Sequence, residues 1–281
     1  IGVDLQLFKQ FNFTFDWFSS KRDRILMKRA SFPSVLGYQN AIPWANVGKV
    51  YNMGFEFSAN WTKQINKDWF IDARVNWTYS KNKYVYVDEP DYPYVWQTQT
   101  GKPLDAMRGY IADGLFESQA EIDASPDQSI FGSTIMPGDI RYRDINGDNK
   151  ITAEDQVMLS PYGNMPRIQY GFGISVQWKD LDASVFFNGS AKRNIMLTGM
   201  YPFCANDSND NNLMKWIADS HWSEGADNSN VLYPRLGTLS TQISNNNQPS
   251  SWWMRNGSFL RFKTLEIGYR LKWFRLYFSA D

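Results

Sequence analysis

Hydrophobic and polar residues alternate along eight separate segments of this chain. In one of them, Ile168, Tyr170 and Phe172 are separated by polar residues or glycines. Successive side chains of a β-strand point to opposite faces, so a period of two predicts strands with one apolar and one polar face. The pattern predicts an all-β chain. The eight predicted strands are 1–7, 11–17, 53–61, 69–79, 168–178, 181–188, 258–271 and 274–280.

The strand predicted at 258–271 changes face partway along. Phe262 lies on one side of the alternation, whereas Leu265 lies on the other. One extra residue in a strand moves every later side chain to the opposite face. The change predicts a β-bulge near Lys263 and Thr264.

The connections between these segments are short and long in turn. A few residues join the strands of each pair, and long segments separate the pairs, including one at about 81–167. Transmembrane barrels have short turns on one rim and long loops on the other, whereas a soluble β-sandwich shows the alternation without this sorting. Trp61, Trp69 and Trp178 lie beside short turns, as in an interfacial aromatic girdle. These features predict a transmembrane antiparallel β-barrel.

Charged residues on the polar faces agree with a water-filled lumen. Eight strands can close a small barrel, but the alternation is already in register at Ile1 and stops midway at Asp281. We therefore expect a fragment of about eight strands from a larger barrel. The charged residues of the polar faces include Asp4, Asp16, Glu56, Asp72, Arg74 and Glu266.

Composition narrows the choice of function. The chain carries 29 basic and 29 acidic residues, so no charge excess suggests a nucleic-acid partner. A single cysteine, Cys204, excludes a disulfide framework or a cysteine-based metal cluster and is expected to be inert. The sequence contains no run of about 18 apolar residues, which a membrane-spanning helix would require. The mean hydropathy of −0.49 is compatible with barrel strands, whose alternation averages out.

A twelve-residue acidic loop at 144–155 has the oxygen-ligand spacing of an EF-hand loop. Asn149 occupies position 6, where glycine is usual, and Asn tolerates the left-handed backbone required there. Ile151 at position 8 is the expected apolar anchor. Asp155 at the last position is shorter than the usual Glu, as in dockerin-type loops. The spacing predicts a structural calcium site; the alternative is an acidic surface turn without an ion. The predicted ligands are Asp144, Asn146, Asp148, Lys150 (through its carbonyl), Thr152 and Asp155.

No catalytic constellation can be assembled from the sequence, so we expect no enzyme. His221 is the only histidine and, beside Trp222, is expected to pack within a loop. Carboxylate pairs such as Glu117 with Glu121 resemble a glycosidase dyad, but among 29 acidic residues such pairs arise freely.

Five ordered motifs point to a known family. They are ANVGKV at 45–50, GKPL at 101–104, PGDIRYRDINGDNKITAEDQ at 137–156, YPRL at 233–236 and RNGSFLR at 255–261. Together they resemble the SusC/RagA-type TonB-dependent transporters of Bacteroidetes, and the resemblance extends over essentially the whole chain. This segment is similar to a later part of the barrel, without the plug and the N-terminal part.

The resemblance implies a 22-stranded outer-membrane barrel with a plug. It also implies energy coupling to the TonB complex through the missing N-terminal part, and a SusD-like lipoprotein lid. Such transporters import oligosaccharides or, in some members, peptides, and transporter–lipoprotein pairs often dimerise. The long segment 81–167 then corresponds to an extracellular loop region that contains the acidic loop.

Five aromatic residues in the long connections are candidates for stacking against substrate rings. The alternative is that they pack against neighbouring loops or the lid. The Asn- and Asp-rich stretches 206–212 and 245–247 are candidates to bind hydroxyl groups, or else are solvated loops. The five aromatic candidates are Tyr92, Tyr94, Trp96, Trp252 and Trp253.

Two other functions remain open at this point. A passive porin-type barrel would have the same strands and the same location. A secreted, calcium-stabilised carbohydrate-binding β-domain would share the alternation and the acidic loop, but it would be soluble without detergent.

Overall fold

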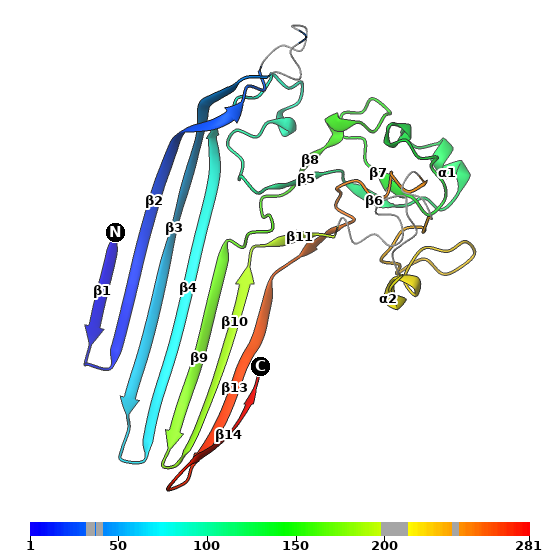
Figure 1. Cartoon of the computed structure of the whole chain (residues 1–281). Coiled ribbons are helices and arrows are strands. Elements are labelled where there is room, and N and C mark those ends of the chain that lie inside the picture. The colour runs from blue at the N-terminus through cyan, green and yellow to red at the C-terminus, as the bar shows by residue number, and fades with distance from the viewer. Residues whose placement is uncertain (32–36, 38–41, 198–212, 238–241) are drawn as a thin grey trace.

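The computed structural model describes residues 1–31, 37, 42–197, 213–237 and 242–281. Its dominant element is one antiparallel sheet of eight strands (Figure 1). The order along the sheet is β1-β2-β3-β4-β9-β10-β13-β14, so β1 and β14 form its two edges. All eight strands predicted from the alternation are present, and the prediction of an all-β barrel fragment is confirmed. The strands are β1 (Gly2–Leu7), β2 (Phe11–Lys28), β3 (Trp44–Gln64), β4 (Trp69–Tyr86), β9 (Ile168–Trp178), β10 (Leu181–Ala191), β13 (Phe259–Arg270) and β14 (Arg275–Ala280).

The register aligns the apolar positions of neighbouring strands on one face. Residues directly opposite each other in an antiparallel pair point to the same side, so one row can be followed from β1 to β13. The adjacent row on the other face is polar or small. The apolar row consists of Leu5, Phe13, Ala59, Val75, Phe172, Phe187 and Phe262, and the polar row of Asp4, Thr14, Ser58, Asn76, Gly171, Asn188 and Arg261.

None of the other described residues covers the apolar face of the sheet. Phe172 is 40% exposed and Leu5 is 47% exposed. Rings of this face pack against one another across strands, as Phe172 and Phe187 do with centroids 5.2 Å apart. Leaving such a surface in water costs about 25 cal/mol for each Å² of apolar area. The face is therefore suited to contact with lipid.

The height of the apolar band agrees with a bilayer. On β4 the outward-facing residues run from Trp69 to Tyr79. Ten steps at about 3.3 Å cover roughly 33 Å along the strand. With a barrel tilt of about 40° this corresponds to roughly 25 Å across the membrane. At the lower end, the rings of Trp69 and Trp178 lie 5.9 Å apart, next to the short turns.

The connection between β2 and β3 is shorter than the alternation predicts. The alternating pattern leaves residues 18–52 as a long polar connection, whereas β2 continues to Lys28 and β3 begins at Trp44. The backbone ladder continues above the apolar band, with Lys21 opposite Tyr51. Alternation marks only the part of a strand that has one apolar face, so it ends before the hydrogen bonding does. For the same reason β4 continues to Tyr86, and the next connection begins at residue 87 instead of 81.

The predicted β-bulge is confirmed. Opposite β10, Thr264 pairs with Phe186 and Phe262 pairs with Phe187, so Lys263 is the extra residue. The bulge allows Phe262 and Leu265 to lie on the same apolar face despite their odd spacing in sequence.

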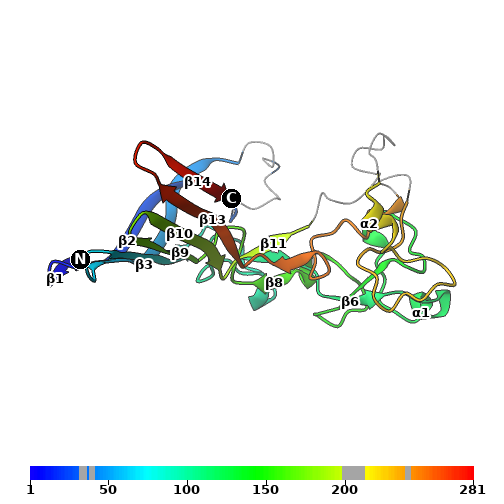
Figure 2. The same ribbon diagram turned by 90° about the horizontal axis from the view of Figure 1, so that it is seen from below.

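Short and long connections lie at opposite ends of the sheet (Figure 1). At the lower end, turns of two to four residues join β1 to β2, β3 to β4, β9 to β10 and β13 to β14. Lys179 in the tightest turn has a left-handed backbone with φ of 53°. Seen from below, the sheet is curved, and the long connections extend to one side of it (Figure 2).

The long connections carry the remaining elements. None of the helices in the described residues is long and apolar enough to cross a membrane. Three two-stranded ribbons, β5 with β8, β6 with β7 and β11 with β12, organise these connections. The strands and α-helices of the long connections are β5 (Met107–Gly109), β6 (Ala112–Leu115), α1 (Gln119–Asp123), β7 (Ile140–Tyr142), β8 (Val157–Ser160), β11 (Asn194–Met196), α2 (Lys215–Ala218) and β12 (Met254–Asn256).

Candidate functional site at the loop end of the sheet

The connections 87–167 and 192–258 pack together beyond the upper strand ends, and we call their described residues the loop assembly (Figure 1). Its core holds apolar side chains from both connections. Tyr110 packs edge-on against Phe131 with ring centroids 5.2 Å apart, and Tyr233 contacts Trp253 at 5.5 Å. The buried core consists of Tyr110, Ile140, Tyr142, Ile151, Ile217, Tyr233, Ile243 and Trp253.

Three buried amide side chains, Gln128, Asn245 and Asn246, join the two connections; we call them the amide cluster. They satisfy the edge of β7 that faces away from β6. Asn246 Oδ1 accepts a hydrogen bond from Ile140 N at 2.8 Å, and Asn245 Nδ2 donates to Ile140 O at 2.9 Å. Gln128 Oε1 accepts from Tyr142 N at 2.7 Å. The amides thus take the place of a neighbouring strand.

The amide cluster is also tied to its surroundings. Gln128 Nε2 donates to Asn245 Oδ1 at 2.8 Å, and Asn246 Nδ2 donates to Asp139 Oδ1 at 2.7 Å. Asn245 and Asn246 are both 0% exposed. The expectation that residues 245–247 bind hydroxyl groups or form a solvated loop is therefore wrong for these two, and only Asn247 is exposed. The stretch 206–212 and Cys204 lie outside the described residues.

The acidic loop 144–155 has the winding that its spacing predicts. Asn149 at position 6 is left-handed, with φ of 62°, and Ile151 at position 8 is fully buried in the core. Asp144 Oδ1 accepts from Gly147 N and its Oδ2 accepts from Asn149 N, both at 2.7 Å. Asp148 Oδ1 accepts from Lys150 N at 2.9 Å.

The side-chain oxygens of Asp155 and Thr152, two further predicted ligands, also accept hydrogen bonds from the backbone of the loop. Asp155 is fully buried and accepts from Ile145 N at 2.8 Å and Thr152 N at 2.7 Å. Thr152 Oγ1 accepts from Glu154 N at 3.2 Å. In the part of the chain that the structure describes, no group of three or more His, Cys, Asp or Glu side chains converges as a metal site.

Calcium binding by this loop therefore stays a prediction. The oxygens that fit a hard cation best are those of Asp144, Asn146 and Asp148 with the carbonyl of Lys150, because oxygen-rich sites on a wound loop suit calcium.

The predicted stacking residues divide into two groups. Tyr94 and Trp96 stack on each other, with centroids 4.5 Å apart and planes 8° apart. Trp96 Nε1 donates to Glu154 O at 2.7 Å, so this pair supports the acidic loop, and Tyr92 lies half-buried nearby in sequence. Trp253, in contrast, is 2% exposed and donates from Nε1 to Asn246 O at 2.7 Å.

Trp253 is thus a core residue that offers no open ring face to a substrate. Trp252 is half-buried and packs against the same core. The rings of Tyr92, Tyr94 and Trp96, in the connection 87–167, remain partly exposed.

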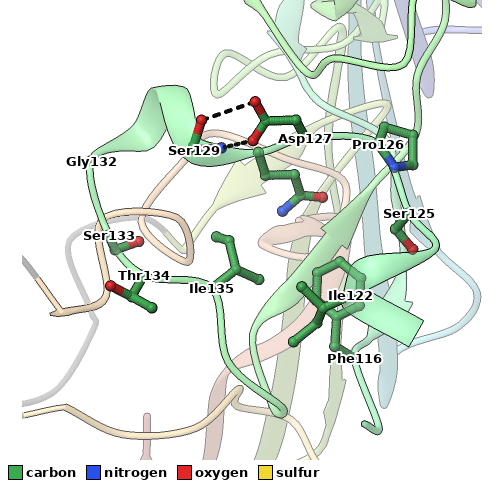
Figure 3. A pocket seen from close by; sticks show the side chains of 11 residues that line it. Phe116, Ile122, Ser125, Pro126, Asp127, Ser129, Gly132, Ser133, Thr134 and Ile135 are labelled. Atoms are coloured by element: carbon green, nitrogen blue, oxygen red, sulfur yellow. Dashed lines mark hydrogen bonds between the residues drawn. The ribbon is translucent and has the colours of Figure 1, made fainter. Parts of the chain in front are cut away.

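A pocket of about 560 Å³ opens between α1 and the segment that follows it in the connection 87–167. Figure 3 shows Phe116, Ile122 and Ile135 on one side and the Asp127–Ser129 pair on the other. Hydrogen bonds from the backbone and hydroxyl of Ser129 lower the pKa of Asp127. Sequence reasoning missed this pocket, since the only local signal, Ser-Pro-Asp at 125–127, marks a turn and not a cavity.

The polar face of the sheet contains a second hollow, of about 440 Å³. Asn12, Ser58 and Asn76 line it, together with Arg74, whose guanidinium carbon lies 5.2 Å from the ring centroid of Phe186. A cation on an aromatic ring within a polar wall can contact a polar solute that passes along the sheet.

His221 has no catalytic geometry. Its Nδ1 lies 2.7 Å from Ala218 O and its Nε2 lies 3.1 Å from Ser223 Oγ, both within the same turn. No carboxylate hydrogen-bonded to His221 is present among the described residues, so the ring closes a local turn as expected.

Comparison with known proteins confirms the resemblance. TonB-dependent receptor P3 of Formosa agariphila is 24% identical over 290 aligned residues, which cover 96% of this chain and 26% of that protein. TonB-dependent receptor P26 of the same organism is 26% identical over 264 residues, covering 89% and 25%. The chain thus spans about a quarter of the length of these relatives. No family model matches the chain.

Solved structures show the same fold. The structure of the RagAB peptide transporter superposes with a TM-score of 0.61 at 18% identity, over 93% of this chain and 26% of that one. The RagAB importer in its closed-closed state gives a TM-score of 0.60 at 18% identity, over 95% and 28%. These similar proteins are receptors and transporters, not enzymes, which agrees with the expectation from sequence.

Proposed function

We propose that this chain forms part of the wall and outer mouth of an outer-membrane TonB-dependent importer of the SusC/RagA type. The continuous apolar face of the eight-stranded sheet carries the proposal, because an apolar band of about 25 Å suits an outer-membrane barrel. An open sheet has two edges of unpaired backbone groups, which lipid does not tolerate. In the complete protein, further strands would pair with β1 and β14 and close the barrel.

The polar face would line the lumen through which the substrate passes. Arg275 forms ion pairs there with Asp182 and with Glu266, and the hollow beside Arg74 contains amides and hydroxyls. Such a wall offers hydrogen bonds to a large polar solute. Oligosaccharides or peptides are the proposed cargo; RagAB is described as a peptide transporter, and this similarity supports peptides.

The loop assembly would form the mouth and the seat of a SusD-like lipoprotein lid. Its own buried core and the amide cluster make it a rigid platform, and recognition usually lies on loops held by a rigid scaffold. Val95, Ile130 and Trp216 remain exposed on it and would give the lid an apolar surface to cover. Contact with the TonB complex is assigned to no residue of this chain.

Topology can be tested by epitope insertion in the full-length protein. An epitope after Gly225, in an exposed turn of the loop assembly, should bind antibody on intact cells. The same epitope in the Lys179-Asp180 turn should bind only after the outer membrane is permeabilised. Labelling of both sites on intact cells, or of neither, would refute this placement of the sheet.

Transport can be tested with a strain that lacks the full-length gene. It should lose energised uptake of either labelled oligosaccharides or labelled oligopeptides, and uptake should also stop when the proton gradient that drives TonB is collapsed. Uptake that persists without the gradient would indicate a passive porin. Unchanged uptake of both cargo classes in the deletion strain would reject the proposal.

A further inference from the structure

Four lysines lie on the outward face of the sheet just above the apolar band; we call Lys21, Lys81, Lys83 and Lys192 the lysine belt. On β4, Lys81 and Lys83 are the two outward residues that follow Tyr79. On β2, Lys21 is opposite Tyr51, which in turn is opposite Lys83. With strands about 4.8 Å apart, the backbones of Lys21 and Lys83 are separated by roughly 10 Å.

Lys192 joins the belt because of a strained backbone. It follows the last residue of β10, and its φ of 53° lies in the left-handed region, which is unfavourable for a lysine by about 1 kcal/mol. Alternation alone would place the side chain on the polar face. Instead, Lys192 Nζ lies 5.5 Å from the ring centroid of Tyr79, on the outward face.

The belt's charge is uncompensated within the described residues. All ion pairs found there are made by arginines, and none involves a lysine of the belt. Arg167, which also lines this region, is held by Asp105 at 2.7 Å, so its charge is already paired. The two outward rows that carry Lys81 and Lys83 contain no carboxylate.

Two of these lysines, Lys81 and Lys83, line a pocket of about 350 Å³. Tyr51, Met53 and Tyr79 line it from the sheet, and Pro103 and Tyr162 contribute from the loop assembly. Cations on top of an apolar and aromatic surface, at the level where acyl chains end, match a phosphorylated lipid head group whose chains lie along the band below.

We propose that the lysine belt binds the phosphate groups of an anionic lipid in the membrane leaflet on the loop side. This inference rests on the proposed outer-membrane location. Lysine binds phosphate as a compact charge with three donors, and four such charges just above the apolar band can engage a head group with more than one phosphate. Lipid bound there would also contact Tyr162 and so link the leaflet to the loop assembly.

The test uses the full-length protein, purified in a zwitterionic detergent, with a bis-phosphorylated glycolipid as the probe. Tryptophan fluorescence or native mass spectrometry reports binding to the wild type and to a variant with all four belt lysines changed to Gln. The matched control changes four lysines at the opposite rim to Gln: Lys9, Lys63, Lys67 and Lys179. Each lysine near an anionic surface is worth about five-fold in affinity, so the loss of all four should weaken binding by the belt variant roughly 600-fold. The rim control should bind like the wild type.

Two control ligands distinguish a lipid site from a site for free phosphate. The dephosphorylated glycolipid should bind as weakly to the wild type as the phosphorylated form does to the belt variant. Inorganic phosphate at millimolar concentration should not displace the lipid; full displacement would indicate a free-phosphate site and overturn the lipid assignment. Equal binding by the wild type and the belt variant would overturn the proposal as well.

Membrane fractionation and uptake assays on the same strains keep the two proposals distinguishable. A belt variant that is found in the outer membrane and imports its cargo, yet binds the phosphorylated lipid like the wild type, refutes only the lipid site. A wild-type protein that is absent from the outer membrane refutes the proposed function, and with it the premise of the lipid site.

Discussion

Replacing Asn246 by Ala should loosen the loop assembly at β7. The substitution removes the acceptor of Ile140 N–H, which is 0% exposed and out of reach of water, and one donor to Asp139. An unsatisfied buried donor costs about 1–3 kcal/mol, and a lost hydrogen bond to a charged group adds about 1.5 kcal/mol or more. Asp139 keeps Arg235, whose Nε lies 2.6 Å from Oδ1, so we take about 2–4 kcal/mol for the whole change.

Native-state hydrogen exchange of the full-length protein measures this directly. A loss of about 2–4 kcal/mol lowers the protection of the Ile140 amide roughly 30- to 1,000-fold. Asn246→Leu, which keeps the volume, should behave like Asn246→Ala, because the amide and not the packing is responsible. The control Asn247→Ala changes an exposed neighbour and should leave the protection within about two-fold. If Asn246→Ala matches that control, the amide cluster does not hold β7.

Three further predictions address the two faces of the sheet, the acidic loop and the pocket. Phe172→Lys places a charge in the apolar band and should weaken folding into lipid vesicles by about 2–4 kcal/mol, whereas Asn76→Lys on the polar face should change it little; equal losses in denaturant titrations would contradict the assignment of faces. Calcium at about 100 times its dissociation constant should stabilise the loop assembly by about 2.7 kcal/mol, and Asp144→Ala should abolish this gain in thermal melts with and without chelator; a wild type indifferent to calcium excludes the site. The lowered pKa of Asp127 gives a stabilisation that is present above the unfolded value of about 3.9 and is lost as the pH falls through the folded value; the protection of the Ser129 amide, relative to its intrinsic exchange rate at each pH, should therefore fall in acid, and Asp127→Asn should remove that dependence.

The sequence alone predicted the sheet well because lipid imposes a simple rule on its strands. Where one face meets lipid, every second residue must be apolar, so segments such as 168–178 and even the bulge at Lys263 are visible in the pattern. Above the band both faces are solvated and the rule ends. The parts of β2 after Trp17 and of β3 before Met53 in sequence show no periodic pattern, although the backbone ladder continues there.

The loop assembly was beyond sequence reasoning for a different physical reason. Its core joins residues more than a hundred positions apart, as the bond of Gln128 to Asn245 does, and no local period encodes such a pairing. An Asn-rich stretch is typical of solvated loops, and only the buried edge of β7 turns Asn245 and Asn246 into structural residues. The acidic loop was easier, because its spacing and the left-handed Asn149 are local properties.

The amide cluster has a consequence for the proposed importer. A sheet edge satisfied by side chains instead of a strand fixes β7 without leaving a free edge that another strand could join. The same residues connect the two long connections, which arise from different strands of the wall, so a displacement of one connection strains the bonds of Asn245 and Asn246 to the other. If a lid opens the mouth of the importer, the loop assembly would therefore move as one body. The chain would bend next to Val87 and Arg193, where the two connections leave the sheet. Cross-linking the two connections within the assembly should then leave uptake intact, whereas cross-linking the assembly to the wall should slow it; the opposite result would place the moving part inside the assembly.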